Sequence, residues 1–255
     1  MIRIVILGFG NVGQHLFRAF STATEIEVIQ VYNRSKIEFP EGFITNSTTN
    51  ITNLKEADIY IIAVPDDHIK DISETIPKFN KLVVHTSGSI SINDLSQQNW
   101  RGIFYPLQSF SKNRKVDFKN IPICIESERI EDGVLLNRLG KIISNNVTEI
   151  SSEERMKLHL SAVIVNNFVN YLYQVGSDLL AENSLSFDLL KPLIKETAHK
   201  IETLTPFEAQ TGPAKRNDKK TIEKQLHLLK DSPHKELYRE MTNAILREYK
   251  KGKQD

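Results

Sequence analysis

The chain has 255 residues, which is enough for one large domain or two modest ones. Its 33 basic and 32 acidic residues give a net charge of +1, without the basic excess expected of a nucleic-acid-binding protein. The single cysteine, Cys124, excludes an intramolecular disulfide, and with no paired histidine spacing we expect no metal site. No apolar run is long enough to cross a membrane, and no signal-peptide pattern is present, so we expect a cytoplasmic protein without a membrane partner.

The first part of the chain alternates strand and helix patterns. Short apolar, β-branched segments predict strands at residues 2–7, 27–32, 44–53 (a short strand and loop), 58–64, 81–86, 102–105, 121–126 and 147–150. Apolar periodicity predicts helices at residues 14–21, 68–76 and 132–144. This alternation is typical of right-handed crossovers and a parallel sheet. We therefore predict an α/β Rossmann domain with a doubly wound parallel sheet over residues 1–150.

The pattern changes near Ser151. Two glutamates follow Ser151 and Ser152, as at the start of a helix. Further helices are predicted at residues 158–175, 187–204, 221–229 and 234–249, and no strand is predicted after residue 150. No Gly/Ser-rich linker separates the two parts. The sequence therefore predicts a second, all-helical domain over residues 151–255.

Residues 8–13 read GFGNVG, between the first predicted strand and the first predicted helix. In a dinucleotide-binding fold the first glycine allows a tight turn, the second lets the backbone approach a pyrophosphate, and the third lets the helix pack on the strand. The helix N-terminus then offers unpaired N–H groups to the phosphates. Three glycines in an ordinary turn are the alternative, but the context favours a nucleotide site. Its residues are Gly8, Phe9, Gly10, Asn11, Val12 and Gly13.

The end of the second predicted strand bears on the choice of cofactor. An acidic residue there would bond the ribose 2′-hydroxyl of NAD, but the strand is followed by Asn33, Arg34 and Ser35. The Arg34 guanidinium can pair with a 2′-phosphate, and Ser35 can donate a hydrogen bond to it. A solvated surface arginine is the alternative. We expect NADP as the cofactor.

Two further strand ends belong to the same edge of a doubly wound sheet, where ligands bind. Ala63, Val64, Pro65 and Asp66 are expected to pass near the ribose and nicotinamide of the cofactor, although Pro65 is equally consistent with a plain strand end. Ser87 belongs to the small-residue loop HTSGS, where a substrate would meet the cofactor. An ordinary turn explains this loop equally well.

Polar side chains interrupt the apolar helix predicted at residues 158–175. If buried, they need hydrogen-bond partners in the core; if they face a cleft, they can hold a substrate. Four residues share one face at i, i+4, i+7 and i+11, namely His159, Val163, Asn166 and Asn170. Asn167 flanks this face. Later in the chain, Arg216 lies in the stretch TGPAKRND and is either a local ion-pair partner or a substrate contact.

Seven segments, in this order, resemble a bacterial family with a Rossmann-like N-terminal domain and a helical C-terminal domain of unknown function: GFGNVG, NRS, AVPDDHI, HTSGS, YPLQSF, LHLSAVIVNNFVNYLY and TGPAKRND. The resemblance covers essentially the full chain, and AVIVNNF and TGPAKRND are its more specific pieces. The family is labelled as NADP oxidoreductases, similar to deazaflavin-dependent NADP oxidoreductases. The resemblance implies a fold related to pyrroline-5-carboxylate reductase and 6-phosphogluconate dehydrogenase, and a homodimer through the helical domain. It implies no particular substrate.

The sequence departs from the related β-hydroxyacid dehydrogenases at one position. Those enzymes carry a catalytic lysine four residues before an asparagine on the first helix of the second domain. With Asn167 as that asparagine the position is Val163, and with Asn166 it is Ala162, neither of which transfers a proton. His159 lies one turn earlier and can replace the lysine as an acid, since imidazole titrates near neutral pH. A structural histidine is the alternative.

These observations predict an NADP(H)-dependent oxidoreductase that transfers hydride to or from a small carbonyl or imine substrate in a cleft between the domains. His159 would supply the proton, and Asn167 would orient the acceptor group. Ser87, Asn166 and Arg216 complete the predicted substrate site. An NADP(H)-binding sensor or scaffold without turnover is the alternative, and the missing lysine favours it.

Overall fold

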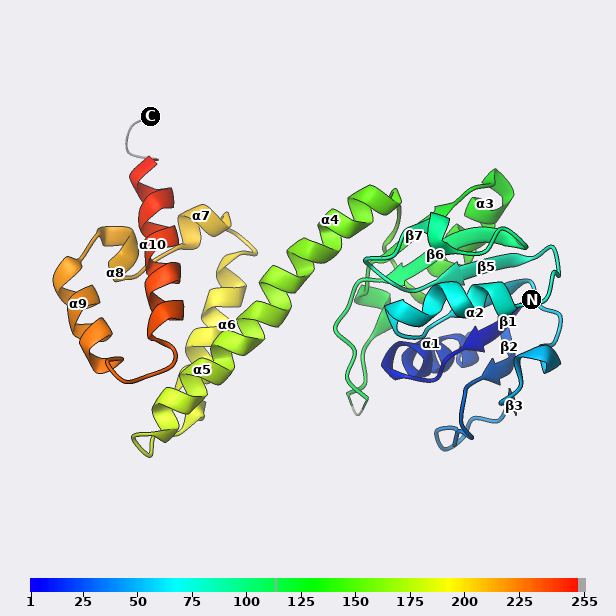
Figure 1. The fold of residues 1–255 in the computed structure, drawn as a ribbon, viewed down its shortest axis with the longest axis horizontal. Helices are drawn as coiled ribbons and strands as arrows, with labels where there is room; N and C mark the ends of the chain where they lie inside the picture. Colours follow the sequence, from blue (N-terminus) through cyan, green and yellow to red (C-terminus); the bar gives the residue numbers. More distant parts are fainter. Residues whose placement is uncertain (113, 252–255) are drawn as a thin grey trace. The chain divides into compact units, whose positions relative to one another are not determined.

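The computed structural model of the chain describes residues 1–112 and 114–251. The chain divides into two compact units, Met1–Asn167 and Phe168–Asp255. Figure 1 shows that the first unit holds the sheet and its helices, whereas the described part of the second unit consists of helices and their connections. The first unit runs past residue 150 because the next helix packs on the sheet. A domain boundary at residue 150 remains a prediction.

The first unit is built on one eight-stranded sheet, with the order β3-β2-β1-β4-β5-β6-β7-β8. Its strands are β1 (Ile2–Leu7), β2 (Ile26–Tyr32), β3 (Asn46–Thr48), β4 (Ile59–Ile62), β5 (Leu82–His85), β6 (Trp100–Pro106), β7 (Ile123–Ser127) and β8 (Val147–Glu149). The order reverses between β1 and β4, which makes their carboxyl ends the topological switch point where ligands bind in such sheets. The α/β class and the mostly parallel sheet are confirmed.

One pair of neighbouring strands differs from the predicted all-parallel arrangement. β6 and β7 pair antiparallel, and β8 follows β7 in parallel, so the last two strands run against the other six. Among the described residues of the connection from β6 to β7, the helical turn is the short 3₁₀ segment η4 (Phe118–Asn120). A parallel return usually runs through a helix, and the described residues of this connection form no α-helix.

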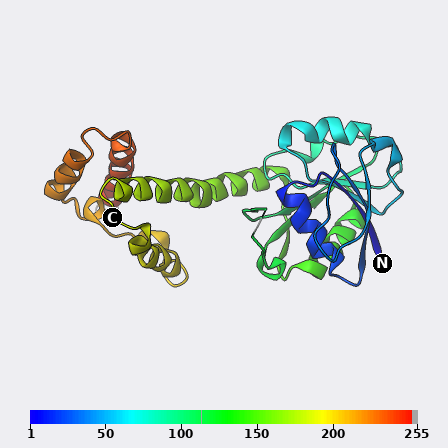
Figure 2. The ribbon, with the colours of Figure 1, turned by 90° about the horizontal axis from the view of Figure 1, so that it is seen from below.

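Two hydrophobic cores cover the two faces of the sheet (Figure 2). On one face lie α1 (Asn11–Ser21) and α3 (Ile130–Ile143), and on the other lies α2 (Ile69–Thr75). Leu16, Phe17 and Phe20 are buried because they recur on one side of α1. Short 3₁₀ turns connect the elements: η1 (Ile51–Asn53), η2 (Asp66–His68) and η3 (Ile92–Asp94).

The helix after β8 begins at a capping box. Ser151 Oγ accepts a hydrogen bond from the Glu154 backbone, and Glu154 Oε2 accepts one from the Ser151 backbone. This helix is α4 (Ser152–Ala162), and it is followed by the π-helical segment η5 (Val163–Phe168). A π turn closes its hydrogen bonds at i→i+5 instead of i→i+4. The regular spacing predicted for one α-helical face therefore does not continue through η5.

The second unit has little apolar interior of its own. Its helices are α5 (Val169–Ala181), η6 (Phe187–Leu190), α6 (Lys191–Lys200), α7 (Pro206–Ala209), α8 (Pro213–Arg216), α9 (Lys219–Leu228) and α10 (Lys235–Lys251). Among its described side chains, the buried hydrophobic ones are Ala214, Ile222 and Leu229. Large exposed apolar side chains are numerous: Phe168, Tyr171, Tyr173, Leu185, Leu189, Leu193, Ile201, Leu204, Phe207, Leu228 and Met241.

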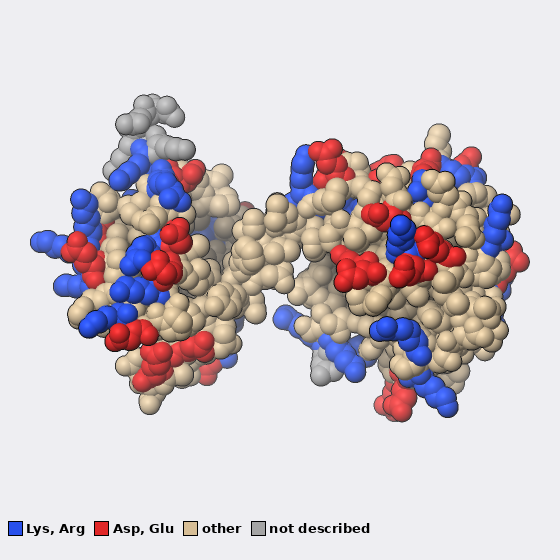
Figure 3. Space-filling model, viewed as in Figure 1, with Lys and Arg blue, Asp and Glu red and all other residues tan. Residues whose placement is uncertain are grey.

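Charged side chains of both signs are interspersed on the face of the second unit that Figure 3 shows, and no basic patch gathers there. Among the helices that the structure describes, none combines the length and apolar character needed to span a membrane. The described residues also contain no cluster of three or more His, Cys, Asp or Glu side chains placed to hold a metal ion.

Candidate functional site

The three glycines of the GFGNVG turn differ in what surrounds them. Gly8 has φ +102°, and a Cβ there would lie 2.5 Å from the Ala63 carbonyl oxygen. A Cβ at Gly13 would lie 2.2 Å from the Gly8 carbonyl oxygen. A Cβ at Gly10 would meet no atom within 4 Å. The fold thus requires glycine at positions 8 and 13, whereas open space lies beside Gly10 at the N-terminus of α1.

A cavity of about 280 Å³ lies at the carboxyl ends of β1, β2 and β4, which is the switch point of the sheet. It brings together most of the predicted cofactor residues: Gly8, Phe9, Gly10, Asn33, Arg34, Ala63, Val64 and Pro65. Its wall also contains residues that sequence reasoning did not select, namely Tyr32, His68, Asp71 and Ile72. His68 belongs to the AVPDDHI segment, so that motif was the available signal for this part of the wall.

Asn33 ties the glycine turn to the end of β2. Its Oδ1 accepts a hydrogen bond from the Phe9 backbone at 3.2 Å, and its Nδ2 donates to the Ser35 carbonyl and hydroxyl oxygens at 3.0 and 3.2 Å. Asn33 therefore orders the segment that carries the exposed Arg34. The first turn of α1 contains no acidic residue. The open N-terminus of α1 and the nearby guanidinium both suit the phosphates of NADP.

The remaining predicted cofactor residues lie around this cavity but do not line it. Asn11 and Val12 form the first residues of α1, and the Asn11 side chain donates to the Phe110 carbonyl at 3.1 Å. Asp66 follows β4, where its Oδ2 accepts a hydrogen bond from the Ser89 hydroxyl at 2.7 Å. Asp66 thereby links the end of β4 to the loop after β5.

The loop after β5 is organised by a buried histidine. His85 is fully buried, its Nδ1 accepts from the Ser87 backbone at 3.1 Å, and its Nε2 lies 3.4 Å from the Ser91 carbonyl oxygen. Burial, and next the neighbouring Arg155 guanidinium, lower the pKa of His85 to about 4. Neutral His85 thus accepts at Nδ1 and donates at Nε2. The predicted substrate residue Ser87 also serves this loop, since its Oγ accepts from the Ser89 and Ile90 backbones.

His159 of α4 lies directly on this loop. Its Nδ1 is 3.0 Å from the Tyr105 hydroxyl oxygen, and a Cβ at Gly88 would lie 2.5 Å from the same Nδ1. The structure therefore brings His159 together with the Ser87 loop and with Tyr105 of β6. Sequence reasoning did not select Tyr105, although the YPLQSF segment contains it.

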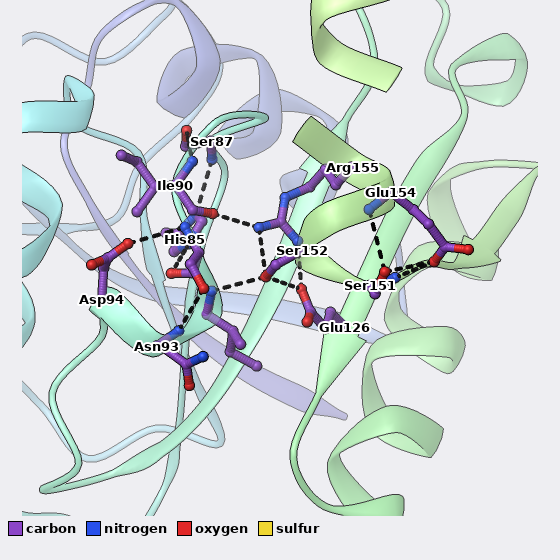
Figure 4. A network of polar contacts seen from close by, with 12 residues as sticks. His85, Ser87, Ile90, Asn93, Asp94, Glu126, Ser151, Ser152, Glu154 and Arg155 are labelled. Carbon is purple, nitrogen blue, oxygen red and sulfur yellow. Dashed lines mark hydrogen bonds and ion pairs between the residues drawn. The ribbon is translucent and has the colours of Figure 1, made fainter. Parts of the chain in front are cut away.

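A buried network holds α4 in this place (Figure 4). Arg155 is completely buried, and its guanidinium donates to Glu126 Oε2 of β7 at 2.6 Å and to the Ile90 carbonyl. The Ser152 hydroxyl donates to the same carboxylate oxygen at 2.6 Å and accepts from the Ile92 backbone at 3.0 Å. Since His159 lies one turn after Arg155, this network fixes the position of the imidazole relative to the loop.

The other predicted substrate residues have exposed side chains. Asn166 and Asn167 are exposed in η5, and Arg216 is exposed at the end of α8 in the second unit. A role for these three side chains in binding remains a prediction.

Two family models match the chain. Residues 3–88 match the model described as NADP oxidoreductase, coenzyme F420-dependent, and residues 121–245 match a domain of unknown function, DUF2520. A “putative NADP oxidoreductase” from Bacteroides fragilis has a solved structure that is 35% identical, with a TM-score of 0.84, covering 96% of this chain and 98% of that one. No curated protein sequence matches the chain.

Two more distant structures share the fold. Plasmodium falciparum pyrroline carboxylate reductase, solved with NADP bound, is 16% identical with a TM-score of 0.62, over 96% of this chain and 100% of that one. An imine reductase from Streptomyces aurantiacus is 13% identical with a TM-score of 0.68, over 96% of this chain and 93% of that one.

Proposed function

The chain belongs to the NADP oxidoreductase family that includes the Bacteroides fragilis protein, and we propose that it transfers hydride between NADP(H) and a small carbonyl or imine substrate. One observation carries this proposal. His159 lies on the loop after β5, and Asp66 connects that loop to the end of β4, where the cavity with the glycine turn begins. A group able to donate a proton is thus linked, through the Ser89–Asp66 hydrogen bond, to the strand end that borders the cavity.

The proposed cofactor site uses the chain's own phosphate-binding chemistry. The backbone at Gly10, Asn11 and Val12 would receive the pyrophosphate, because helix N–H groups and open space meet there. Arg34, held next to Asn33, would pair with the 2′-phosphate. Bound NADPH would supply hydride at its nicotinamide. The NADP-bound Plasmodium reductase supports this proposal through its shared fold.

The chain's own side chains would handle the proton. Positively charged His159 would give a proton to the oxygen or nitrogen of the acceptor group as that atom gains an electron pair, and would regain one from water. Ser87, Asn166 and Asn167 would orient the acceptor group, and Arg216 would contact the substrate. The imine and carboxylate-bearing substrates named for the fold relatives motivate the choice of test compounds.

We also propose that the helical unit pairs with a second copy of the chain. A unit of this size with so few buried hydrophobic side chains lacks a sufficient core, while its large apolar side chains stay exposed. Two-fold homodimers are the most common closed assembly. A second copy would cover part of this apolar surface, including Leu189 and Leu193.

The test is steady-state oxidation of NADPH against a panel of ketones, cyclic imines and 2-keto acids. We expect turnover with a member of the panel, and a decrease in kcat of about 100-fold or more in His159→Asn, the size typical of a lost general acid. Calorimetric NADPH binding should stay unchanged in that variant. The matched control is His199→Asn, an exposed histidine of the second unit, which should keep full activity.

Two results would contradict the proposal. If NADPH binds tightly but no panel member is reduced, the chain is a sensor or scaffold. If His159→Asn turns over at the wild-type rate, the proton comes from another group.

A further inference from the structure

Tyr105 lies where the sheet meets α4. It is buried on β6, a strand that pairs with β5 on one side and with β7 on the other. The residue opposite Tyr105 on β7 is Cys124. Its ring meets the His159 imidazole edge to face, with centroids 6.0 Å apart, and its hydroxyl reaches Nδ1. The partner residue is 54 positions away in the sequence, so this contact is a product of the tertiary fold.

Two contacts of His159, with Tyr105 and with Gly88, fall on the same side of the imidazole. The Tyr105 hydroxyl lies 3.0 Å from Nδ1, and the space above Gly88 is filled by Nδ1, Cγ and Cβ. Nε2 lies across the ring from these atoms. The packing therefore holds Nδ1 against Tyr105 and Gly88, and Nε2 is the ring nitrogen outside these two contacts.

The phenol keeps its proton in this environment. Burial is the main cause that raises the pKa of Tyr105 to about 12; nearby Cys124 and Asp66 also raise it, and Arg155 lowers it. The hydroxyl oxygen can accept a hydrogen bond from Nδ1–H of the charged imidazole, and it can keep that bond in the neutral form that remains once Nε2 has lost its proton. Tyr105 can thus stay paired with Nδ1 in both states of His159.

We propose that Tyr105 is a positioning residue that holds Nδ1 of His159, so that Nε2 is the atom that exchanges a proton with the substrate. This inference rests on the proposed function of His159. In reduction, hydride from NADPH reaches the carbonyl or imine carbon, and the displaced electron pair moves to the oxygen or nitrogen. That atom takes the Nε2 proton of the charged imidazole, whose N–H electron pair stays on Nε2.

The first test removes only the hydroxyl. Tyr105→Phe should lower kcat about tenfold or more while NADPH binding stays unchanged, because a poorly oriented acid is a weak catalyst. The same substitution in a His159→Asn background should cause no further loss. If Tyr105 acts on the structure independently of His159, Tyr105→Phe would lower kcat by the same factor in the wild type and in His159→Asn. That result would overturn the inference.

The second test does not depend on turnover. In ¹⁵N-histidine-labelled protein, Tyr105→Phe should move the Nδ1 resonance of His159 toward that of a free imidazole. An unmoved resonance would overturn the pairing. If the wild type reduces nothing, the proposed function and the catalytic part of this inference both fail, and the resonance still shows whether Tyr105 binds Nδ1.

Tyr60→Phe is the matched control. Tyr60 is also buried with its pKa raised to about 12, but its hydroxyl contacts the backbone at Lys55 and Ala57. Its loss should leave kcat and the His159 resonances unchanged. Urea unfolding of all variants, followed by the fluorescence of the single tryptophan, Trp100, verifies that they are folded.

Discussion

The three glycines of the turn at residues 8–13 are not all needed for the same reason. Gly8 and Gly13 are required by contacts inside the protein, with the Ala63 and Gly8 carbonyls respectively. Gly10 is not required by any such contact, which is why its place in the sequence points to a ligand. The binding of a pyrophosphate beside Gly10 remains a prediction.

We expect the choice between NADPH and NADH to depend on Arg34. If its guanidinium pairs with a 2′-phosphate, Arg34→Ala should weaken NADPH binding by about 1.5–3 kcal/mol, or at least tenfold in Kd, as for other charge-assisted hydrogen bonds. NADH binding should be unchanged, because NADH lacks that phosphate. Calorimetry with both nucleotides measures the difference. Lys36→Ala, an exposed cation two residues later, is the control, and equal losses for NADPH and NADH in Arg34→Ala would contradict the role.

His85 makes the stability of the first unit depend on pH. Its pKa is about 4 when folded and 6.5 when exposed, so between these values the unfolded state binds the extra proton. This contribution to stability is fully present above pH 6.5 and is lost as the pH falls toward 4. We expect the free energy of unfolding to be about 2 kcal/mol lower near pH 5 than near pH 8.

Urea unfolding at several pH values, followed by Trp100 fluorescence, measures this effect. His85→Gln can still accept and donate hydrogen bonds but cannot titrate, so its stability should vary less in that pH interval. An identical pH dependence in the variant would assign the effect to other groups.

At the scale of elements, α4 is held by its first turns. Arg155 and Glu126 form a buried ion pair, and removing one member leaves the other without its partner. Arg155→Met should therefore lower the free energy of unfolding by about 3 kcal/mol or more. Urea unfolding of the wild type and of Arg155→Met measures this difference in the free energy of unfolding.

The same helix provides a control for that substitution. Lys157 pairs with Glu153 on the exposed side of α4, with both side chains more than 70% exposed. Lys157→Met should change the free energy of unfolding by less than about 0.5 kcal/mol. Comparable losses in the two variants would show that burial of the Arg155 pair has no special importance.

The local apolar pattern of the sequence predicted most helices and strands, but it did not predict where a strand reverses direction or where a helix becomes a π-helix. The strands and helices of the first unit follow their apolar periodicity, yet the antiparallel β7 and the π turn of η5 were not predicted. Both depend on packing. The connection before β7 shows no α-helix among its described residues, and its length permits either strand direction; the apolar pattern through η5 is compatible with α- or π-helical hydrogen bonding.

At the scale of the whole molecule, the exposed apolar side chains of the second unit predict self-association. Sedimentation should give a mass about twice the 29.2 kDa of one chain. Glutamate at both Leu189 and Leu193, four residues apart and more than 60% exposed, should produce monomers because the charges would be buried at the contact.

Leu228→Glu provides the comparison, because Leu228 is an exposed leucine of α9, at 83% exposure, and lies outside the segment of Leu189 and Leu193. It should stay dimeric. A wild-type chain that sediments as a monomer would contradict the proposed dimer, and a dimer that survives the double substitution would place the contact elsewhere.

The sequence by itself determined the α/β class, the glycine turn at the end of β1 and the family, because each depends on a pattern of neighbouring residues. It also identified His159 as a candidate. The tertiary structure alone placed His159 against Tyr105 and on the Gly88 loop, and it alone revealed the Arg155–Glu126 network. Residues that meet across several strands and a helix leave no periodic signal, since their contact depends on how the elements pack.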